Sequence, residues 1–330
     1  MRSPAIREKH LSSSLPQGLN KSIAILITLS LCTSVFLCSC GNDNDTLFLT
    51  SATEEATVTE TEAATILYES IPGLKSGLFC DLTHGKLLYA ENTEELISPA
   101  SLTKLLTACT ALIYVRPEVC FTVGTELGLI SPGSSLCLIS EGHILSLYDL
   151  LSGLLMASGN DAAYTIAVNV ARLMNSDSEI SDKEAVSYFV SLMNSFAKSI
   201  GMKNSNFTNP DGWDDENQYT TVSDLLILTK TALHFRIIRD ITGTAEKYVL
   251  FKSGESITWT NSNQLLNSSS PYYNNCAIGM KTGTTEKAGS CLIAAFIKDE
   301  KTYIGIVTGC ETNEKRYEIM NYLFNRYAYT

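Results

Sequence analysis

The sequence predicts an α+β domain in which an antiparallel sheet is flanked by helices and joined to a helical subdomain. Strand-like segments lie near both ends of the body, whereas residues 144–235 between them read as mostly helical. The chain has 330 residues, of which 45% are hydrophobic and 18% are charged. This composition is typical of a globular protein and allows a sizeable core, in one large domain or two smaller ones.

Residues 1–39 read as a targeting segment. A basic stretch ends at Lys21, and an apolar run follows from Ile23 to Leu37. This run is short for a bilayer span of about 20 residues and suits the hydrophobic region of a secretory signal. It ends in Leu37-Cys38-Ser39-Cys40, which resembles a bacterial lipobox and predicts lipidation of Cys40. The alternative is an uncleaved signal anchor, and both place an exported body at the outer face of the cytoplasmic membrane.

Residues 40–66 are expected to form a flexible acidic tether ahead of a folded body at residues 67–330. The tether is rich in Thr, Glu and Ala without apolar periodicity, so it cannot bury enough surface to offset its ordering entropy. The net charge is −11 overall and +3 over residues 1–39, which leaves −14 for the remainder. Nucleic-acid binding needs clustered Lys and Arg, so this charge excludes nucleic acid as an expected partner.

The strands follow from short apolar segments bounded by turn residues. Residues 78–81 and 86–89 flank Thr83-His84-Gly85 and predict a hairpin. Five more strands are expected, at residues 247–251, 257–260, 277–281, 291–297 and 303–308. The polar turn 298–301 predicts that the last two strands form a hairpin.

The helices follow from apolar positions at helical spacing. Pro99 precedes a helical run that begins at Ser101 and continues through Leu112. A closing helix is expected over residues 313–326. The helical middle of the chain comprises four predicted helices, at residues 147–156, 162–174, 184–200 and 223–235.

Seven cysteines fall in the body, and we interpret them as buried small hydrophobic residues. None forms a Cys-x-x-Cys pair, and an exported location would permit disulfides whose connectivity the sequence does not assign. The four histidines are scattered, so no zinc site is expected. The seven are Cys80, Cys109, Cys120, Cys137, Cys276, Cys291 and Cys310.

Ser101-Leu102-Thr103-Lys104 is the first motif that can carry chemistry. A serine hydroxyl is a weak nucleophile unless a base activates it, and residues three apart on a helix share a face. A lysine serves as a base only when its pKa falls far below about 10.4, which burial and a neighbouring cation such as Lys281 can achieve. Ser195 and Lys198 have the same spacing, but their amphipathic helix and the lack of a preceding Pro favour a solvated pair.

Two further motifs suggest partners for this pair. Ser158-Gly159-Asn160 follows an apolar helix, and its glycine permits a tight turn that presents a hydroxyl beside an amide. Taken alone it is more typical of a helix N-cap. Lys281-Thr282-Gly283-Thr284 ends a strand, where an ammonium and a hydroxyl can bind a carboxylate and Gly283 lets a substrate backbone approach.

Together these motifs resemble the serine-type D-alanyl-D-alanine carboxypeptidases, which are low-molecular-mass penicillin-binding proteins. The resemblance covers roughly residues 70–330 and implies the three-layer α/β/α fold shared with serine β-lactamases. The matching runs are Pro99-Ala100-Ser101-Leu102-Thr103-Lys104-Leu105-Leu106-Thr107, Met156-Ala157-Ser158-Gly159-Asn160-Asp161-Ala162-Ala163, Gly201-Met202-Lys203-Asn204-Ser205-Asn206-Phe207 and Gly279-Met280-Lys281-Thr282-Gly283-Thr284-Thr285-Glu286-Lys287-Ala288-Gly289.

The resemblance implies a role for each motif residue. Ser101 would attack the carbonyl between two D-alanines of a peptidoglycan pentapeptide, with Lys104 as the base, and β-lactams would acylate the same serine. Ser158 would relay the proton and Asn160 would hold the substrate amide. Lys281, Thr282 and Gly283 would bind substrate, and the N–H of Thr284 with that of Ser101 would form an oxyanion hole. No metal and no organic cofactor is required.

Two departures from the family pattern affect substrate binding and anchoring. Some relatives carry an arginine near Asn261–Asn263, where this chain has Ser262, so carboxylate binding would fall on Lys281, Thr282 and Thr284. Many relatives also have a C-terminal β-rich domain and a membrane-binding helix, which are not expected here because the chain stops at Thr330. A lipid at the N-terminus would replace that anchor.

Three alternatives remain. A β-lactamase would hydrolyse the acyl-enzyme fast, usually through a Glu-activated water, but no Glu-x-x-x-Asn loop is identifiable and Asp211–Glu216 does not match one. A non-catalytic penicillin- or peptidoglycan-binding lipoprotein would place no chemical requirement on Ser101 and Lys104. A calcium site in the acidic loop Asp211–Glu216 is the third, although carboxylates in a solvated loop are commonplace.

Overall fold

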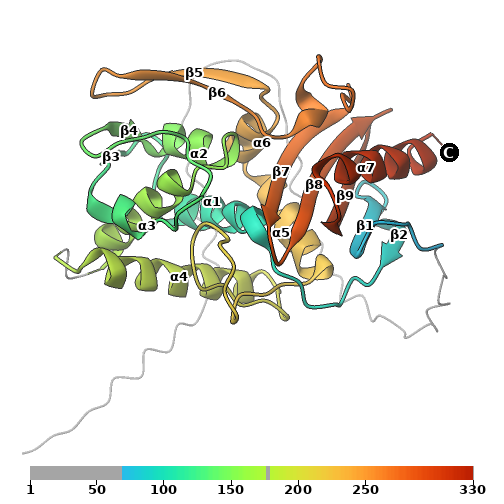
Figure 1. Ribbon diagram of the computed structural model, residues 1–330, viewed down its shortest axis with the longest axis horizontal. Coiled ribbons are helices and arrows are strands. Elements are labelled where there is room, and N and C mark those ends of the chain that lie inside the picture. The colour runs from blue at the N-terminus through green and yellow to red at the C-terminus, as the bar shows by residue number, and fades with distance from the viewer. Residues whose placement is uncertain (1–68, 176–178, 330) are drawn as a thin grey trace, which may run out of the picture. The chain divides into compact units, whose positions relative to one another are not determined.

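The computed structural model describes residues 69–175 and 179–329, and these contain a five-stranded antiparallel sheet. The strand order is β2-β1-β9-β8-β7, so strands from both ends of the chain lie side by side, as predicted (Figure 1). The predicted signal at 1–39, the lipidation site Cys40 and the tether at 40–66 lie outside the described residues. The strands are β1 (Ser76–Asp81), β2 (Lys86–Glu91), β7 (Ala277–Thr285), β8 (Gly289–Lys298) and β9 (Lys301–Cys310).

Side chains alternate along each strand, so apolar residues lie on both faces of this sheet, and helices cover both faces. On one face, Phe79 of β1 and Phe296 of β8 belong to a core cluster with Phe324 of α7 (Asn313–Tyr327). On the other face, Leu78 and Cys80 belong to a larger cluster shared with α1, α2, α3 and α5. The result is a three-layer α/β/α arrangement, which agrees with the predicted fold class.

Six helices form the remainder of the body: one corresponds to the predicted run that begins at Ser101, four correspond to the predicted helical middle, and one is an addition. The seven-residue helix α6 was not predicted, because it follows α5 with only Phe235 between them. The helices are α1 (Thr103–Tyr114), α2 (Leu147–Leu155), α3 (Asn160–Met174), α4 (Asp182–Ser199), α5 (Val222–His234) and α6 (Arg236–Thr242).

Short elements connect these helices and strands. The predicted strands near 247–251 and 257–260 are β5 (Glu246–Leu250) and β6 (Ser256–Thr260), which pair with each other and not with the main sheet. A second ribbon joins β3 (Cys120–Thr122) to β4 (Ile144–Ser146). Three 3₁₀ helices complete the body, η1 (Ala100–Leu102), η2 (Thr125–Leu129) and η3 (Gln264–Leu266).

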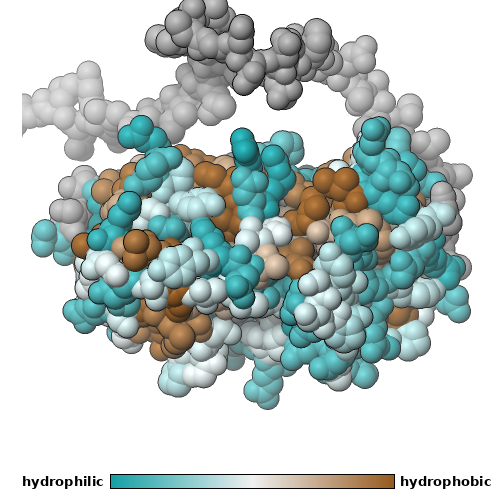
Figure 2. All heavy atoms as spheres, turned by 90° about the horizontal axis from the view of Figure 1, so that it is seen from above, coloured by the Kyte–Doolittle hydropathy of each residue, from teal (hydrophilic) through white to brown (hydrophobic). Residues whose placement is uncertain are grey.

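The β5–β6 hairpin faces the viewer in Figure 2, where brown patches alternate with hydrophilic surface. Tyr248 and Leu250 of β5 are 65% and 61% exposed. Within the described ranges, no helix is both long and apolar enough to span a bilayer. Five of the seven body cysteines are buried, as interpreted from the sequence, but the interpretation was wrong for Cys120, which is exposed, and for Cys276, which is partly exposed. No disulfide joins any of the seven.

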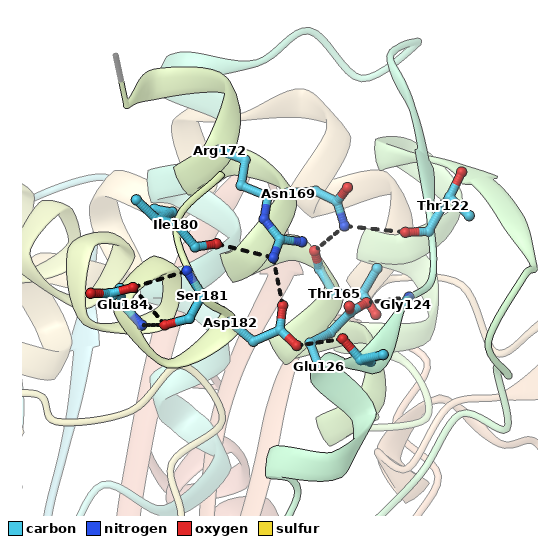
Figure 3. A network of polar contacts seen from close by, with 11 residues as sticks. Thr122, Gly124, Glu126, Thr165, Asn169, Arg172, Ile180, Ser181, Asp182 and Glu184 are labelled. Atoms are coloured by element: carbon cyan, nitrogen blue, oxygen red, sulfur yellow. Dashed lines mark hydrogen bonds and ion pairs between the residues drawn. The ribbon is translucent and has the colours of Figure 1, made fainter. Parts of the chain in front are cut away.

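A polar network fixes α3 against α4 and η2 (Figure 3). Arg172 Nη2 donates to the carbonyl oxygen of Ile180 at 3.2 Å and pairs with Asp182 Oδ1 at 2.8 Å. Asp182 Oδ2 in turn accepts from Thr125 Oγ1 at 2.6 Å. Ser181 and Glu184 form a capping box at the start of α4. The network therefore holds α3, whose first residue is Asn160, in a fixed place relative to its neighbours.

Candidate active site

Ser101 and Lys104 lie together where η1 leads into α1. The helix begins two residues later than predicted, at Thr103, because Ala100–Leu102 form a 3₁₀ turn. Ala100 has a φ of +47°, a left-handed conformation that L-residues adopt at a cost and that clusters at functional sites. This bend leaves Ser101 partly exposed while Lys104 is fully buried, and their Nζ and Oγ atoms are 2.8 Å apart.

Lys104 is fully buried, and its Nζ contacts three oxygen acceptors. It donates to Ser101 Oγ at 2.8 Å, to Asn160 Oδ1 at 2.7 Å and to the carbonyl oxygen of Asp211 at 2.7 Å. Burial lowers the pKa of Lys104 to about 8, while the negative charges of Asp211 and Asp161 act in the opposite direction. Burial is thus the largest cause, and a substantial fraction of Lys104 is neutral near pH 8.

Ser158, Gly159 and Asn160 form the second side of the site. Ser158 has a φ of +60°, and its Oγ accepts from Lys281 Nζ at 2.9 Å. A Cβ at Gly159 would lie 2.5 Å from Asp161 Oδ1 and 2.7 Å from Cys137 Sγ, so only glycine fits there. Asn160 is the first residue of α3, and its Oδ1 and Nδ2 point in different directions, one to Lys104 and the other to Asp211.

The edge strand β7 forms the third side. Lys281 is buried, and its Nζ donates to Ser158 Oγ and to the carbonyl oxygen of Thr282, both at 2.9 Å. Burial, with repulsion from Lys104 and Arg316, holds the pKa of Lys281 well below its usual range. A Cβ at Gly283 would lie 3.1 Å from the backbone nitrogen of Ser101, so the strand passes directly beside Ser101. The structure therefore brings together the three motifs that begin at Ser101, Ser158 and Lys281.

Asp211 belongs to this site, although its acidic loop was expected to be solvated. Its side chain is buried, and its carboxylate accepts from Asn160 Nδ2 at 2.5 Å and from the Trp213 backbone at 3.2 Å. Burial raises the pKa of Asp211, and the Lys104 charge opposes that rise. By accepting from Nδ2, Asp211 leaves Oδ1 of Asn160 to face Lys104. A sequence signal was available in Gly212, because a turn there can direct the preceding residue inward.

The carboxylates of this loop do not gather around a common point. Asp214 Oδ1 accepts from Ser98 Oγ at 2.7 Å and from Thr285 Oγ1 at 2.8 Å, whereas Asp211 turns towards Asn160. Across residues 69–175 and 179–329, no group of three or more metal-ligating side chains is close enough to hold an ion. The calcium interpretation therefore receives no support from the loop geometry.

Arg316 is a second residue of this site that was not predicted from the sequence. It lies on α7 and is 7% exposed, and its Nη1 donates to the Gly283 carbonyl oxygen at 3.1 Å and to Thr284 Oγ1 at 3.0 Å. The sequence did carry a signal for a buried Arg316. It stands four residues before the buried Met320, and this spacing places its cation on the apolar face of the helix. The guanidinium thus brings positive charge to β7 at Gly283 and Thr284.

Ser262, which stands where some relatives have an arginine, lies beside Thr282 of the same strand. Its Oγ is 2.7 Å from Thr282 Oγ1, so the two hydroxyls form a pair. Carboxylate binding was expected to fall on Lys281, Thr282 and Thr284 alone. The structure places the Arg316 guanidinium beside this group, since it contacts Thr284 directly.

Comparisons with known proteins agree with this geometry. The family profile described as D-alanyl-D-alanine carboxypeptidase, Peptidase_S11, matches residues 69–312. The D-alanyl-D-alanine carboxypeptidase DacF of Bacillus subtilis is 30% identical over 260 residues, covering 77% of this chain and 62% of that protein. DacC of Escherichia coli is also 30% identical over 260 residues, covering 74% and 58%. The chain thus spans about three fifths of the length of these curated relatives.

Comparison with solved structures also finds proteins of this fold. The Streptomyces K15 DD-transpeptidase matches with a TM-score of 0.69 and 27% identity, covering 78% of this chain and 100% of that one. Penicillin-binding protein D2 of Listeria monocytogenes, in its ampicillin-bound form, matches with a TM-score of 0.63 and 25% identity. That match covers 78% of this chain and 98% of the Listeria chain.

Proposed function

The chain belongs to the D-alanyl-D-alanine carboxypeptidase family, Peptidase_S11, and we propose that it removes the terminal D-alanine from peptidoglycan stem peptides through an acyl-enzyme on Ser101. One observation carries the proposal. A buried lysine with a lowered pKa lies 2.8 Å from a partly exposed serine hydroxyl, beside a strand that passes the nucleophile. This arrangement matches the requirements of nucleophilic catalysis by serine.

Acylation begins when neutral Lys104 accepts the proton of Ser101. The Ser101 oxygen bonds to the carbonyl carbon between the two D-alanines, and negative charge develops on the carbonyl oxygen. The N–H groups of Ser101 and Thr284 are the proposed oxyanion donors, and removing one such donor typically lowers turnover about 10²–10³-fold. Ser158 passes the proton from Lys104 to the leaving nitrogen, the C–N bond breaks, and D-alanine departs.

Deacylation uses the same groups with water as the nucleophile. Lys104 accepts a proton from water as the water oxygen bonds to the ester carbonyl carbon. The bond to Ser101 Oγ then breaks, Lys104 returns the proton to Ser101, and the shortened peptide leaves. Asn160 holds the substrate amide, and Lys281, Thr282 and Thr284 bind the terminal carboxylate with help from the Arg316 charge. A β-lactam would acylate Ser101 by the same route and inhibit the enzyme covalently.

Release of free D-alanine tests this proposal. Residues 41–330 are incubated with a peptide that ends in D-Ala-D-Ala and, separately, with the same peptide ending in D-Ala-L-Ala. We expect release from the first peptide alone, and none from the Ser101→Ala variant. Rapid penicillin hydrolysis without D-alanine release would indicate a β-lactamase instead, and neither activity in a folded sample would favour a non-catalytic binding protein.

The pH dependence of kcat/KM should report the ionisation of Lys104. With a pKa of about 8, activity should rise roughly tenfold per pH unit below pH 8 and level off above it. Asp211→Asn removes a negative charge that raises the pKa of Lys104, while an amide oxygen can still accept from Asn160 Nδ2. The inflection should therefore move to lower pH in this variant. Glu216→Gln, which removes an exposed charge from the same loop, serves as the control, and an unchanged or higher inflection in Asp211→Asn would contradict the electrostatic role.

We also infer that the protein is exported and held at the outer face of the cytoplasmic membrane by a lipid on Cys40. The apolar run before Cys40 and the small residue at position 39 support this inference. In bacteria fed a radiolabelled fatty acid, the full chain should incorporate label, Cys40→Ser should not, and Cys32→Ser should behave as the wild type. Unlabelled but membrane-bound wild-type protein would instead indicate a signal anchor.

A further inference from the structure

Residues 134–139, which stand between η2 and β4, lie against the turn that joins α2 to α3. The backbone nitrogen of Asn160 donates to the carbonyl oxygen of Ser135 at 2.8 Å. A Cβ at Gly159 would lie 2.7 Å from both the Cβ and the Sγ of Cys137, so these two residues are in close contact. The contacts fix the path of the turn, which also contains the proposed proton relay.

Asp161, the second residue of α3, fastens this segment to the helix. It is 2% exposed, and its carboxylate accepts from three backbone nitrogens. Oδ1 accepts from Cys137 at 2.9 Å and from Ala162 at 3.0 Å, and Oδ2 accepts from Ile139 at 3.1 Å. Leu138 has a φ of +66°, and a turn of this kind can direct the N–H groups on either side of it at one anion. One buried carboxylate therefore holds the segment and the first turn of α3 together.

The conformation of Ser158 makes this support important. Its φ of +60° is left-handed, and a residue in such a conformation keeps it only where the surrounding contacts determine it. On one side, Lys281 Nζ donates to Ser158 Oγ at 2.9 Å. On the other side, the turn is held at Gly159 and Asn160 by the segment that Asp161 fastens. If the segment were released, the turn could relax and the hydroxyl would point elsewhere.

The thiol of Cys137 is the other reactive group of the segment, and it serves as a packing group. Burial, with the Asp161 carboxylate as a second cause, raises the pKa of this thiol well above its usual range, so the thiol stays neutral. The β5–β6 hairpin lies above α2 in Figure 1, and Trp259 of β6 donates its Nε1 to the Cys137 carbonyl oxygen at 2.7 Å. The segment is thus fixed from the hairpin as well as from α3.

We propose that Asp161 is a positioning residue for the proton transfer to the leaving group. It holds residues 134–139 against the turn, and the turn then presents Ser158 Oγ to the leaving nitrogen. Asp161 acts through the backbone of its neighbours and exchanges no proton itself. This inference rests on the proposed function, in which Ser158 passes the proton from Lys104 to that nitrogen.

Two substrates with the same acyl part and different leaving groups test this role. One peptide ends in D-Ala-D-Ala, and its amine can leave only with a proton. The other has the matching α-mercapto acid in place of the last D-alanine, joined as a thioester. Its leaving group departs as a thiolate, because a thiol ionises at about pH 8.5. We measure kcat/KM at about pH 9.5, where a lysine with a pKa of about 8 is mostly neutral, so that the effect of the Asp161 charge on Lys104 does not enter.

Asp161→Ala should lose activity selectively on the amide. We expect kcat/KM to fall about 10²-fold for the amide, as for a misplacement of about 1 Å, and less than about fivefold for the thioester. Asp161→Asn keeps one oxygen acceptor, so its loss on the amide should be smaller, about tenfold, with the thioester again spared. This milder variant decides the matter if Asp161→Ala does not fold.

Asp224 provides the matched control, because it is a buried carboxylate that fastens a different segment. It is 4% exposed and accepts from the backbone nitrogens of Lys203 at 3.2 Å and Asn204 at 2.7 Å, outside the three motifs. Asp224→Ala should unfold at lower urea concentration than the wild type but keep both rates. Equal losses on the two substrates in the Asp161 variants, or no loss on the amide, would overturn the positioning role while wild-type D-alanine release still supports the proposed function. No release by the wild type would overturn both.

Discussion

Replacing Lys104 with alanine is expected to lower the rate of Ser101 acylation by about 10³–10⁴-fold, the upper range for loss of a general base. The reason is geometric as well as electrostatic. Lys104 Nζ is the group 2.8 Å from Ser101 Oγ, and burial has already lowered its pKa to about 8. No other basic side chain in the described residues bonds to that hydroxyl. Stopped-flow acylation with a chromogenic β-lactam measures the rate directly.

Lys198 provides a matched control, because it belongs to the second Ser-x-x-Lys sequence. It is exposed on α4, and its partner Ser195 donates to the carbonyl oxygen of Ser191 at 2.8 Å. Lys198→Ala should therefore acylate at the wild-type rate. If Lys104→Ala kept more than about a tenth of the wild-type rate while remaining folded, Lys104 would not be the base.

Gly212→Ala is expected to lower the free energy of unfolding by about 3 kcal/mol or more and to abolish acylation. A Cβ there would lie 1.8 Å from the carbonyl oxygen of Ala100, a distance that forces the backbone apart. Since Ala100 precedes the nucleophile, its displacement would move Ser101 away from Lys104. Urea unfolding and the acylation rate constant together measure both effects.

Gly201→Ala is a control that tests the cost of a left-handed backbone conformation without a steric clash. Gly201 has a φ of +98°, close to the +89° of Gly212, but a Cβ there would contact nothing within 4 Å. This control should lose only about 1–2 kcal/mol, the cost of a left-handed conformation, and should keep its acylation rate. Equal behaviour of the two variants would show that the Gly212 contact with Ala100 does not position the nucleophile.

The sequence predicted those parts of the fold that have a local signal. The hairpin of β1 and β2, the β8–β9 hairpin and the helices of the middle section appear within a few residues of their expected bounds. The motif residues Ser101, Lys104 and Lys281 carry a signal in their spacing and context, so their meeting in one site was foreseeable.

The positions that residues take through long-range contacts could not be predicted from the sequence in the same way. Asp211 stands in a polar, acidic loop, and only the folded chain shows that it turns inward to Asn160. Arg316 lies 33 residues after Gly283, the residue whose carbonyl oxygen it contacts, and nothing local links the two. Likewise, β5 and β6 read as ordinary strands, but their pairing outside the main sheet depends on what packs beneath them.

We propose Ser101 as the residue that forms the acyl-enzyme. The most direct measurement is mass spectrometry of the protein after exposure to benzylpenicillin, followed by peptide mapping of the adduct. We predict one penicilloyl group per chain, located on the peptide that contains Ser101, and no adduct on Ser101→Ala. An adduct on any other residue, or one that persists in Ser101→Ala, would contradict the account.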